Sequence, residues 1–181
     1  MKKTLLIGLL LASATLTYAQ VKKATPEAAK SNIETISEQA GTFSKKDFVE
    51  IGKAKEVTVE VIKITDLLSN KIVSGIKLSA NYHASYGSDT KSAMLDADEI
   101  DAFLKVIDYI NNKVFTSEVP ENSVEYNFHS RGGFSGGAYN YSKKWKGYVK
   151  LEKYDSNSYF FLDQEAFKAL GALVSEAKTK L

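Results

Sequence analysis

The 181-residue sequence contains no cysteine. Without thiols the chain cannot form disulfides, a zinc site with cysteine ligands, or the lipid-modified cysteine of a lipoprotein. The fold must therefore be held together by packing alone. The chain is long enough for that, because a domain of about 150 residues buries roughly 70% of its unfolded surface.

Histidine and arginine are also scarce, which limits metal and anion chemistry. The two histidines, His83 and His129, are far apart, and no HExxH or calcium-loop spacing occurs, so we expect no metal and no other cofactor. Arg131 is the only arginine, which weakens any case for a phosphate clamp. We expect the acidic residues at one predicted helix start to interact with the helix dipole instead of a cation: Asp96, Asp98, Glu99 and Asp101.

Apolar residues form only one long run, at the start of the chain. Lys2 and Lys3 precede the run at 4–12, and small residues stand three and one positions before Gln20. This pattern predicts a signal peptide over 1–19 that is cleaved before Gln20. The run is shorter than the ~20 residues that span a bilayer, so we expect no membrane span and a periplasmic or extracellular protein.

The chain carries little net charge of either sign. It has 24 basic and 22 acidic residues, and loss of Lys2 and Lys3 with the signal peptide leaves 22 of each. Nucleic-acid binding normally needs a clustered positive surface, because affinity comes from neutralising phosphates. We therefore expect no nucleic-acid partner.

The segment 20–56 is predicted to hold a helix and a linker. Thr25, Pro26 and Glu27 are typical of an N-cap and first helical turn, and Gly41 is typical of a helix end. Its apolar stripe is modest, so we expect this helix to pack on a neighbour.

The first half of the remaining chain predicts strands and then a helix. Apolar residues alternate with polar ones from Val57 to Val61, a second strand runs through Ile76 and Leu78, and a shorter one ends at Leu95. A helix over 97–112 is predicted next. Asp96 and Glu99 resemble a capping box, and the apolar residues follow at helical spacing: Ile100, Phe103, Leu104, Ile107 and Ile110.

The second half repeats this plan. Alternation over 124–128 predicts a strand, Gly132 and Gly133 predict a two-residue turn, and further strands are expected over 134–141, 147–154 and 159–162. Asp163 then caps a predicted helix over 164–180. Its apolar residues are Phe167, Leu170, Leu173, Val174 and Ala177.

A shift of 67 residues carries Asp96 onto Asp163, Ile100 onto Phe167 and Val57 onto Val124. We therefore predict a degenerate tandem repeat with halves 57–113 and 124–180. The expected fold is α+β: an antiparallel sheet or sheets of about seven to eight strands with two packed helices, in one domain over 57–181, plus the N-terminal helix. Two sheet-then-helix units in tandem resemble the layout of Whirly-type single-stranded DNA-binding regulators. No motif of that group is present, and neutral charge and export argue against its function.

The segment 133–137 spells the GxSxG pattern of serine hydrolases around Ser135. In that motif the serine lies between a strand and a helix and the histidine comes later in the chain, but here strand continues and both histidines come earlier. The single RGG copy at 131–133 lacks the repetition of an RGG tract. Both patterns are better explained as a glycine-rich hairpin turn.

The last prediction concerns an aromatic surface on the second half. The two-residue turn would put Tyr126, Phe128, Tyr139 and Tyr141 on the core face, and pairing Tyr154 with Tyr159 would put other rings on the opposite face. The candidate ligand-binding residues are Trp145, Tyr148, Tyr154, Tyr159 and Phe161. A helix over 26–40, with Phe43 and Phe48, is expected to cover this face as a lid; the alternative is an open binding face.

From these features we expect an exported, non-enzymatic binding or interaction protein of the cell envelope. A sugar, a peptide or a partner protein would suit the aromatic residues. The alternative is a hydrolase whose catalytic residues the sequence does not identify.

Overall fold

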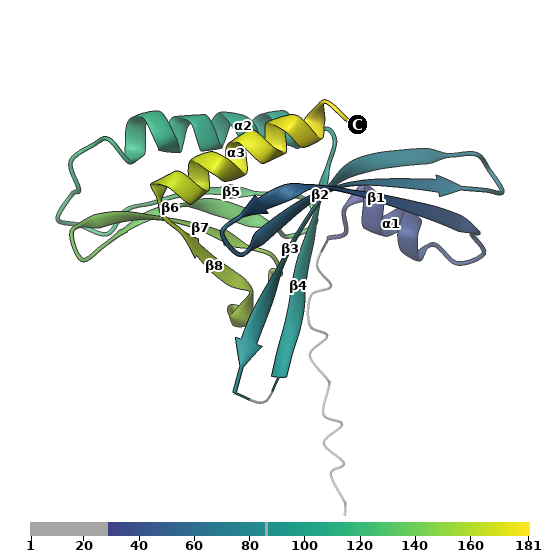
Figure 1. Ribbon diagram of the computed structural model, residues 1–181, viewed down its shortest axis with the longest axis horizontal. Helices are drawn as coiled ribbons and strands as arrows, with labels where there is room; N and C mark the ends of the chain where they lie inside the picture. Colours follow the sequence, from purple (N-terminus) through teal and green to yellow (C-terminus); the bar gives the residue numbers. More distant parts are fainter. Residues whose placement is uncertain (1–28, 86) are drawn as a thin grey trace, which may run out of the picture.

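The computed structural model describes residues 29–85 and 87–181 (Figure 1). The predicted signal peptide and the segment from Thr25 to Glu27 lie outside these residues. The described chain is α+β, with two antiparallel four-stranded sheets and three helices, as the sequence predicted in outline.

The first sheet contains β1 (Ser44–Ala54), β2 (Val57–Asp66), β3 (Ile72–Ala84) and β4 (Gly87–Asp96), in that spatial order. The alternation from Val57 correctly predicted β2. The strand β1 was not predicted, because most of its side chains are exposed and no alternation of buried and exposed residues marks it. Its lysines and the register shift between Glu50 and Gly52 are typical of an edge strand that avoids further pairing.

The second sheet contains β5 (Glu125–His129), β6 (Ser135–Tyr141), β7 (Lys144–Lys150) and β8 (Tyr159–Leu162), again in spatial order. The predicted two-residue turn at Gly132 and Gly133 is wrong. Ser130 N–H donates to the Phe134 carbonyl, Gly133 has φ +88°, and Phe128 pairs with Gly136. The loop therefore has three residues, and the β5–β6 register differs by one from the predicted register.

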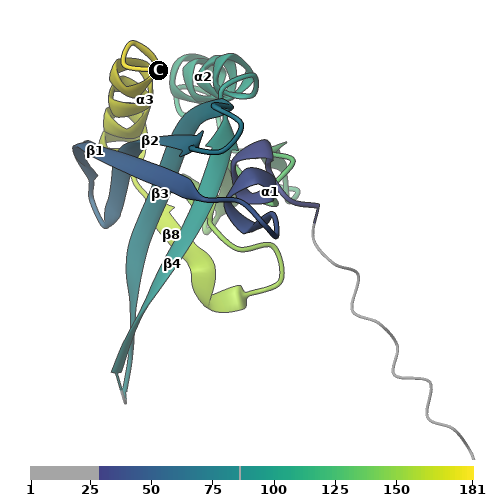
Figure 2. The same cartoon turned by 90° about the vertical axis from the view of Figure 1, so that its right-hand side faces the viewer.

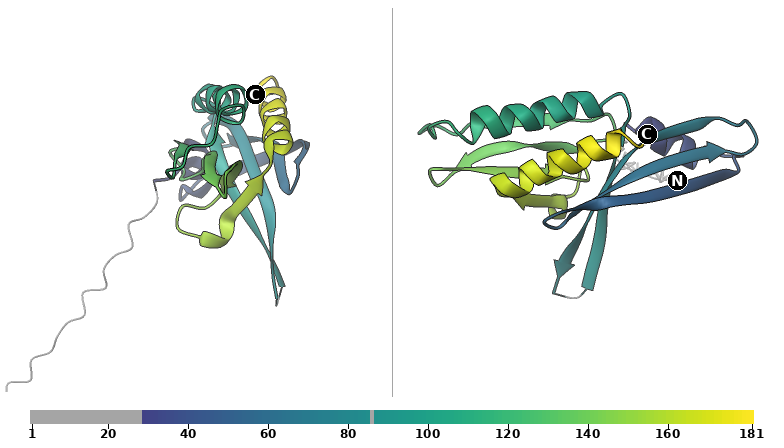
Figure 3. Two further views of the ribbon diagram at one scale, coloured as in Figure 1. Left: turned by 90° about the vertical axis from the view of Figure 1, so that its left-hand side faces the viewer. Right: turned by 45° about the horizontal axis from the view of Figure 1, so that its top comes forward.

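Two helices lie side by side across both sheets (Figure 3). They are α2 (Ile100–Tyr109), which continues into a π-helical turn over Ile110–Val114, and α3 (Gln164–Lys178). The π-helical turn keeps Ile110 and Val114 both buried. Asp163 caps α3 as predicted, by accepting from the Ala166 amide at 2.8 Å. Asp96 does not cap α2, because its carboxylate is used elsewhere.

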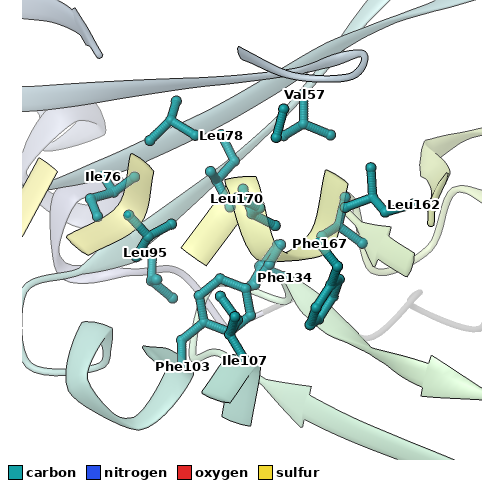
Figure 4. Close-up of a cluster of buried hydrophobic side chains, with 14 of the residues drawn as sticks. Val57, Ile76, Leu78, Leu95, Phe103, Ile107, Phe134, Leu162, Phe167 and Leu170 are labelled. Atoms are coloured by element: carbon teal, nitrogen blue, oxygen red, sulfur yellow. The ribbon is translucent and has the colours of Figure 1, made fainter. Parts of the chain in front are cut away.

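The main core lies between these helices and the inner faces of both sheets (Figure 4). Phe103 of α2 contacts Phe134 edge to face, with ring centroids 5.0 Å apart. Leu78 and Leu95 approach from the first sheet, and Leu162 from the second. One continuous core therefore joins the two sheets.

The third helix, α1 (Asn32–Glu38), lies on the other face of the first sheet, against β2, β3 and β4 (Figure 2). Ile33 and Ile36 pack there on Ile62 and Ile64 in a separate small core. Ser31 is the N-cap of α1, and the helix start predicted near Thr25 lies outside the described residues. The predicted lid is also wrong, because α1 packs on the first sheet and not on the aromatic face of the second.

The predicted repeat corresponds to the structure only in part. Each sheet is followed by a helix, and the shift of 67 pairs buried residues of α2 with buried residues of α3, such as Ile100 with Phe167. The same shift places Val57 of β2 on Val124, beside the edge strand β5, although β2 is an inner strand. The duplication therefore stays a prediction. No helix within the described residues is long and apolar enough to cross a membrane.

Candidate ligand-binding site

The outer face of the second sheet, the face turned away from α2 and α3, carries the candidate site. Strand pairing fixes which side chains meet there: Gly137 of β6 pairs with Tyr148 of β7, which pairs with Phe161 of β8. In the next row, Ser135 pairs with Lys150, which pairs with Tyr159. Because side chains two residues apart share a face, Tyr139 and Tyr141 belong to it as well.

Tyr148 forms the floor of this surface. Its side chain is 4% exposed, and its hydroxyl donates to Glu125 Oε1 at 2.5 Å, so the phenol reaches across β6 to β5. The β6 residue paired with it is Gly137, which has no side chain to block this path. Burial, together with the hydrogen bond to Glu125, raises the pKa of the Tyr148 phenol above its usual range.

Tyr159 and Phe161 form an exposed platform beside this floor. Their rings are nearly parallel, at 12°, with centroids 6.3 Å apart, and they are 42% and 50% exposed. The ring centroids of Tyr159 and Tyr148 are 5.7 Å apart, and those of Tyr139 and Phe161 are 6.2 Å apart. Burial also raises the pKa of Tyr139. The rings therefore support one another in a single cluster, which limits their motion before a ligand arrives.

Two hollows open on this face. The first, which we call the aromatic hollow, measures about 590 Å³ and is lined mainly by Tyr139, Tyr141, Tyr148, Tyr159 and Phe161. The second, the polar hollow, measures about 350 Å³, and Asn127, His129, Ser135 and Lys150 contribute to its lining. The two hollows are contiguous, because Glu125, Tyr148 and Tyr159 line both.

Three of the five predicted binding residues, Tyr148, Tyr159 and Phe161, meet in the aromatic hollow. The other two do not join them. Trp145 packs against the main core, with its ring 5.8 Å from Tyr126 and its Nε1 donating to the Ser117 carbonyl. Tyr154 lies in the loop after β7, under the Lys153 ammonium and outside both hollows.

Tyr139 and Tyr141 were predicted on the core face and were therefore missed. The error came from the turn, because a slip of one residue moves every side chain of a strand to the opposite face. The sequence did contain a usable signal. A three-residue loop with glycine at its left-handed position fits Arg131, Gly132 and Gly133, and that loop would have put both tyrosines outside.

The GxSxG serine does meet a histidine. His129 Nδ1 lies 2.8 Å from Ser135 Oγ across the β5–β6 pair, at the wall of the polar hollow. Within the described part of the chain, no carboxylate hydrogen-bonds to His129. Ser135 lies in an inner strand paired on both sides, which leaves its strand amides engaged and unsuited to an oxyanion hole. A serine-hydrolase site needs a serine–histidine contact, a carboxylate on the histidine and an oxyanion hole, and only the first of these is present here.

The acidic cluster binds arginine and a helix end. Carboxylate oxygens of Asp96, Asp98 and Glu99 lie within 4.8 Å of one another, a grouping that could hold a metal ion. The guanidinium of Arg131 pairs with Asp96 and Asp98, and it lowers the pKa of Asp98. Asp96 also accepts from the Ile33 amide of α1 at 3.2 Å. The expected interaction with the dipole of α2 is therefore not the main role of Asp96.

Comparison with known proteins gives the chain no family. No protein-family model matches it, and a search of curated proteins found no significantly similar sequence.

Proposed function

We propose that this protein is an exported, non-enzymatic carbohydrate-binding protein that uses the outer face of its second sheet. One observation carries the proposal: Tyr159 and Phe161 present nearly parallel, half-exposed rings on a surface that continues into the polar hollow. A solvent-exposed cluster of this size seldom lacks a partner.

A sugar ring matches the chemistry of both hollows. The C–H face of a pyranose packs on the electron-rich face of an aromatic ring, which Tyr159 and Phe161 offer side by side. Its hydroxyls need donors and acceptors, which Asn127 and His129 provide in the polar hollow. The supported rings lose little freedom on binding, so little of the contact energy is spent on ordering them.

Export is the other half of the proposal. It is supported by the signal-peptide pattern of residues 1–19. We place the mature protein in the periplasm or outside the cell, where extracellular or envelope polysaccharides are accessible.

A glycan array probed beside a panel of peptides tests the ligand class. We expect the protein to bind glycans, and the Tyr159→Ala and Phe161→Ala variants to bind about tenfold more weakly, as for the loss of a central aromatic contact. Phe48→Ala is the matched control. Phe48 is a similarly exposed ring, but it lies on the first sheet, so its loss should leave binding unchanged.

Three results would contradict this proposal. Binding of peptides and not of glycans would change the ligand class. An equal loss of glycan affinity in the Phe48→Ala protein and in the Tyr159→Ala and Phe161→Ala proteins would mean that the site lies elsewhere. Labelling of Ser135 by a fluorophosphonate, above the level in the Ser135→Ala protein, would favour the alternative of a hydrolase that uses the His129 contact.

A further inference from the structure

The outward-facing side of β7 carries a row of lysines through the candidate site. Lys144, Lys146 and Lys150 share this face with Tyr148, because they are an even number of residues apart. The Lys146 ammonium lies 4.9 Å from the Tyr141 ring centroid, and the Lys150 ammonium lies 4.9 Å from that of Tyr159. Positive charge therefore projects beside the same rings that form the aromatic hollow.

The acidic groups around this row are already engaged. Glu125 accepts the Tyr148 hydroxyl, and Asp155 pairs with Lys91 at 2.6 Å, with Glu152 3.7 Å from the same ammonium. Within residues 29–85 and 87–181, none of the three β7 lysines forms a salt bridge, although Lys150 lies near enough to Asp155 to contribute to the lowered pKa of that carboxyl. Lys150 donates to the Lys153 carbonyl, which uses one of its three donors.

We infer that the ligand is an acidic polysaccharide, one that carries a carboxylate on its pyranose rings. This inference rests on the carbohydrate-binding proposal and narrows it. A uronic acid keeps its flat C–H face free while its carboxylate projects from the ring edge. It can therefore stack on Phe161 while its carboxylate meets the Lys150 ammonium, which lies over the neighbouring Tyr159 ring.

Other polyanions fit the same surface less well. An acidic peptide brings carboxylates but no flat ring to place on the platform of Tyr159 and Phe161. A single-stranded nucleic acid brings both features, but its phosphates bind through a broad positive field. Here the positive charge comes from the row on β7 and from two neighbours at the polar hollow, Lys153 and Arg131, of which Arg131 is paired with Asp96 and Asp98. The chain after residue 19 has equal numbers of acidic and basic residues, so no broad positive field results.

Isothermal titration calorimetry with polygalacturonate oligomers, and with the same oligomers methyl-esterified, tests the charge directly. The two probes share a sugar backbone and differ in their carboxylates. We expect at least about tenfold tighter binding of the acid form at low salt, and a loss of that advantage as ionic strength rises, because exposed ion pairs are screened.

Lysine variants locate the effect. The double variant Lys146→Gln and Lys150→Gln should bind polygalacturonate about tenfold more weakly, at about threefold for each exposed pair, and should bind the ester as before. Lys168→Gln, an exposed lysine of α3 on the helix-covered side, is the control and should change neither affinity. Lys146 and Lys168 are exposed and Lys150 is partly buried, so thermal melting of each variant checks that folding is unchanged.

The outcomes separate this inference from the carbohydrate proposal. Equal affinity for acid and ester, lowered in Tyr159→Ala, would overturn the acidic ligand and keep the carbohydrate site. Equally tight binding of polyglutamate would make the ligand an acidic peptide, and equally tight binding of oligothymidylate would make it a nucleic acid. Either result would overturn both proposals, as would binding of neither sugar form.

Discussion

The two sheets share one core but differ in what lies on their outer faces. The first sheet presents aliphatic residues, and α1 covers them with Ile33 and Ile36. The second presents tyrosines, a phenylalanine and lysines, and its platform is half exposed. Covering the aliphatic face stabilises the fold, whereas an amphipathic face can stay in water until a ligand binds.

The capping of α1 shows how firmly the first sheet is covered. Four amides at the start of an α-helix need partners from outside the helix or its cap. Ser31 Oγ accepts from the Glu34 amide, the Glu34 carboxylate accepts from the Ser31 amide, and Asp96 accepts from the amides of Asn32 and Ile33. The helix is therefore tied to the end of β4, and through Arg131 to the first hairpin of the second sheet.

The largest expected effect tests this difference in cover. Ile33→Ala should lower the free energy of unfolding by about 2–5 kcal/mol, because Ile33 is 1% exposed and its loss leaves a cavity. Tyr159→Ala and Phe161→Ala should each cost less than about 1 kcal/mol, as surface substitutions do. Urea unfolding measures all three.

The opposite result would be informative. A loss of several kcal/mol in the Phe161→Ala protein would mean that the second sheet is covered as well, and the carbohydrate-binding site could not lie there. A small loss in the Ile33→Ala protein would mean that α1 adds little to the first sheet.

A smaller effect on the free energy of unfolding is expected at Asp96, which links the first sheet to the second through Arg131. Asp96→Ala should cost about 1–3 kcal/mol, because it leaves the Asn32 amide and the buried Ile33 amide without their acceptor and removes one of the two carboxylates that pair with Arg131. Asp98→Ala is the matched control, since Asp98 also pairs with Arg131 but is well exposed, and exposed pairs contribute little. Equal losses in the two variants would show that only the ion pairs matter at this junction.

Much of the fold could be predicted from the spacing of apolar side chains along the sequence. The alternation over Val57 to Val61 found β2, and the helical stripes found α2 and α3, because each of these elements buries one face. The strand β1 buries few side chains, so its sequence shows no alternation of apolar and polar residues. The start of α1 has a local signal, the capping box of Ser31 and Glu34, which the sequence prediction overlooked. It also depends on Asp96, 64 residues away from Asn32, and no local pattern indicates that contact.

The candidate site was predicted correctly where the error in strand register was an even number of residues, because such an error leaves each side chain on the same face of the sheet. Tyr154 was expected opposite Tyr159, but Lys150 is its partner, and this shift of four residues leaves each side chain on its predicted face. Tyr148, Tyr159 and Phe161 were therefore placed correctly. The β5–β6 register was wrong by one residue, so Tyr139 was placed on the wrong face.

The smallest expected effect is a dependence on pH at the floor of the aromatic hollow. Tyr148 has a raised pKa because it is buried and donates to Glu125. When the pH rises above about 10, the unfolded chain ionises this phenol while the folded chain keeps the proton, so stability falls. At pH 10.5 this loss amounts to about 0.8 kcal/mol for a group with an unfolded pKa of about 10.

The Tyr148→Phe variant removes this ionisation and should lose about 0.8 kcal/mol less than wild type between pH 8 and pH 10.5, as measured by urea unfolding. At pH 8 it should be less stable than wild type by no more than about 1 kcal/mol, because the freed Glu125 carboxylate can be solvated. Tyr154→Phe, which alters a phenol outside both hollows, is the control. If the two variants respond alike to pH, Tyr148 is not buried beneath the other rings, and the aromatic hollow lacks the floor on which its platform depends.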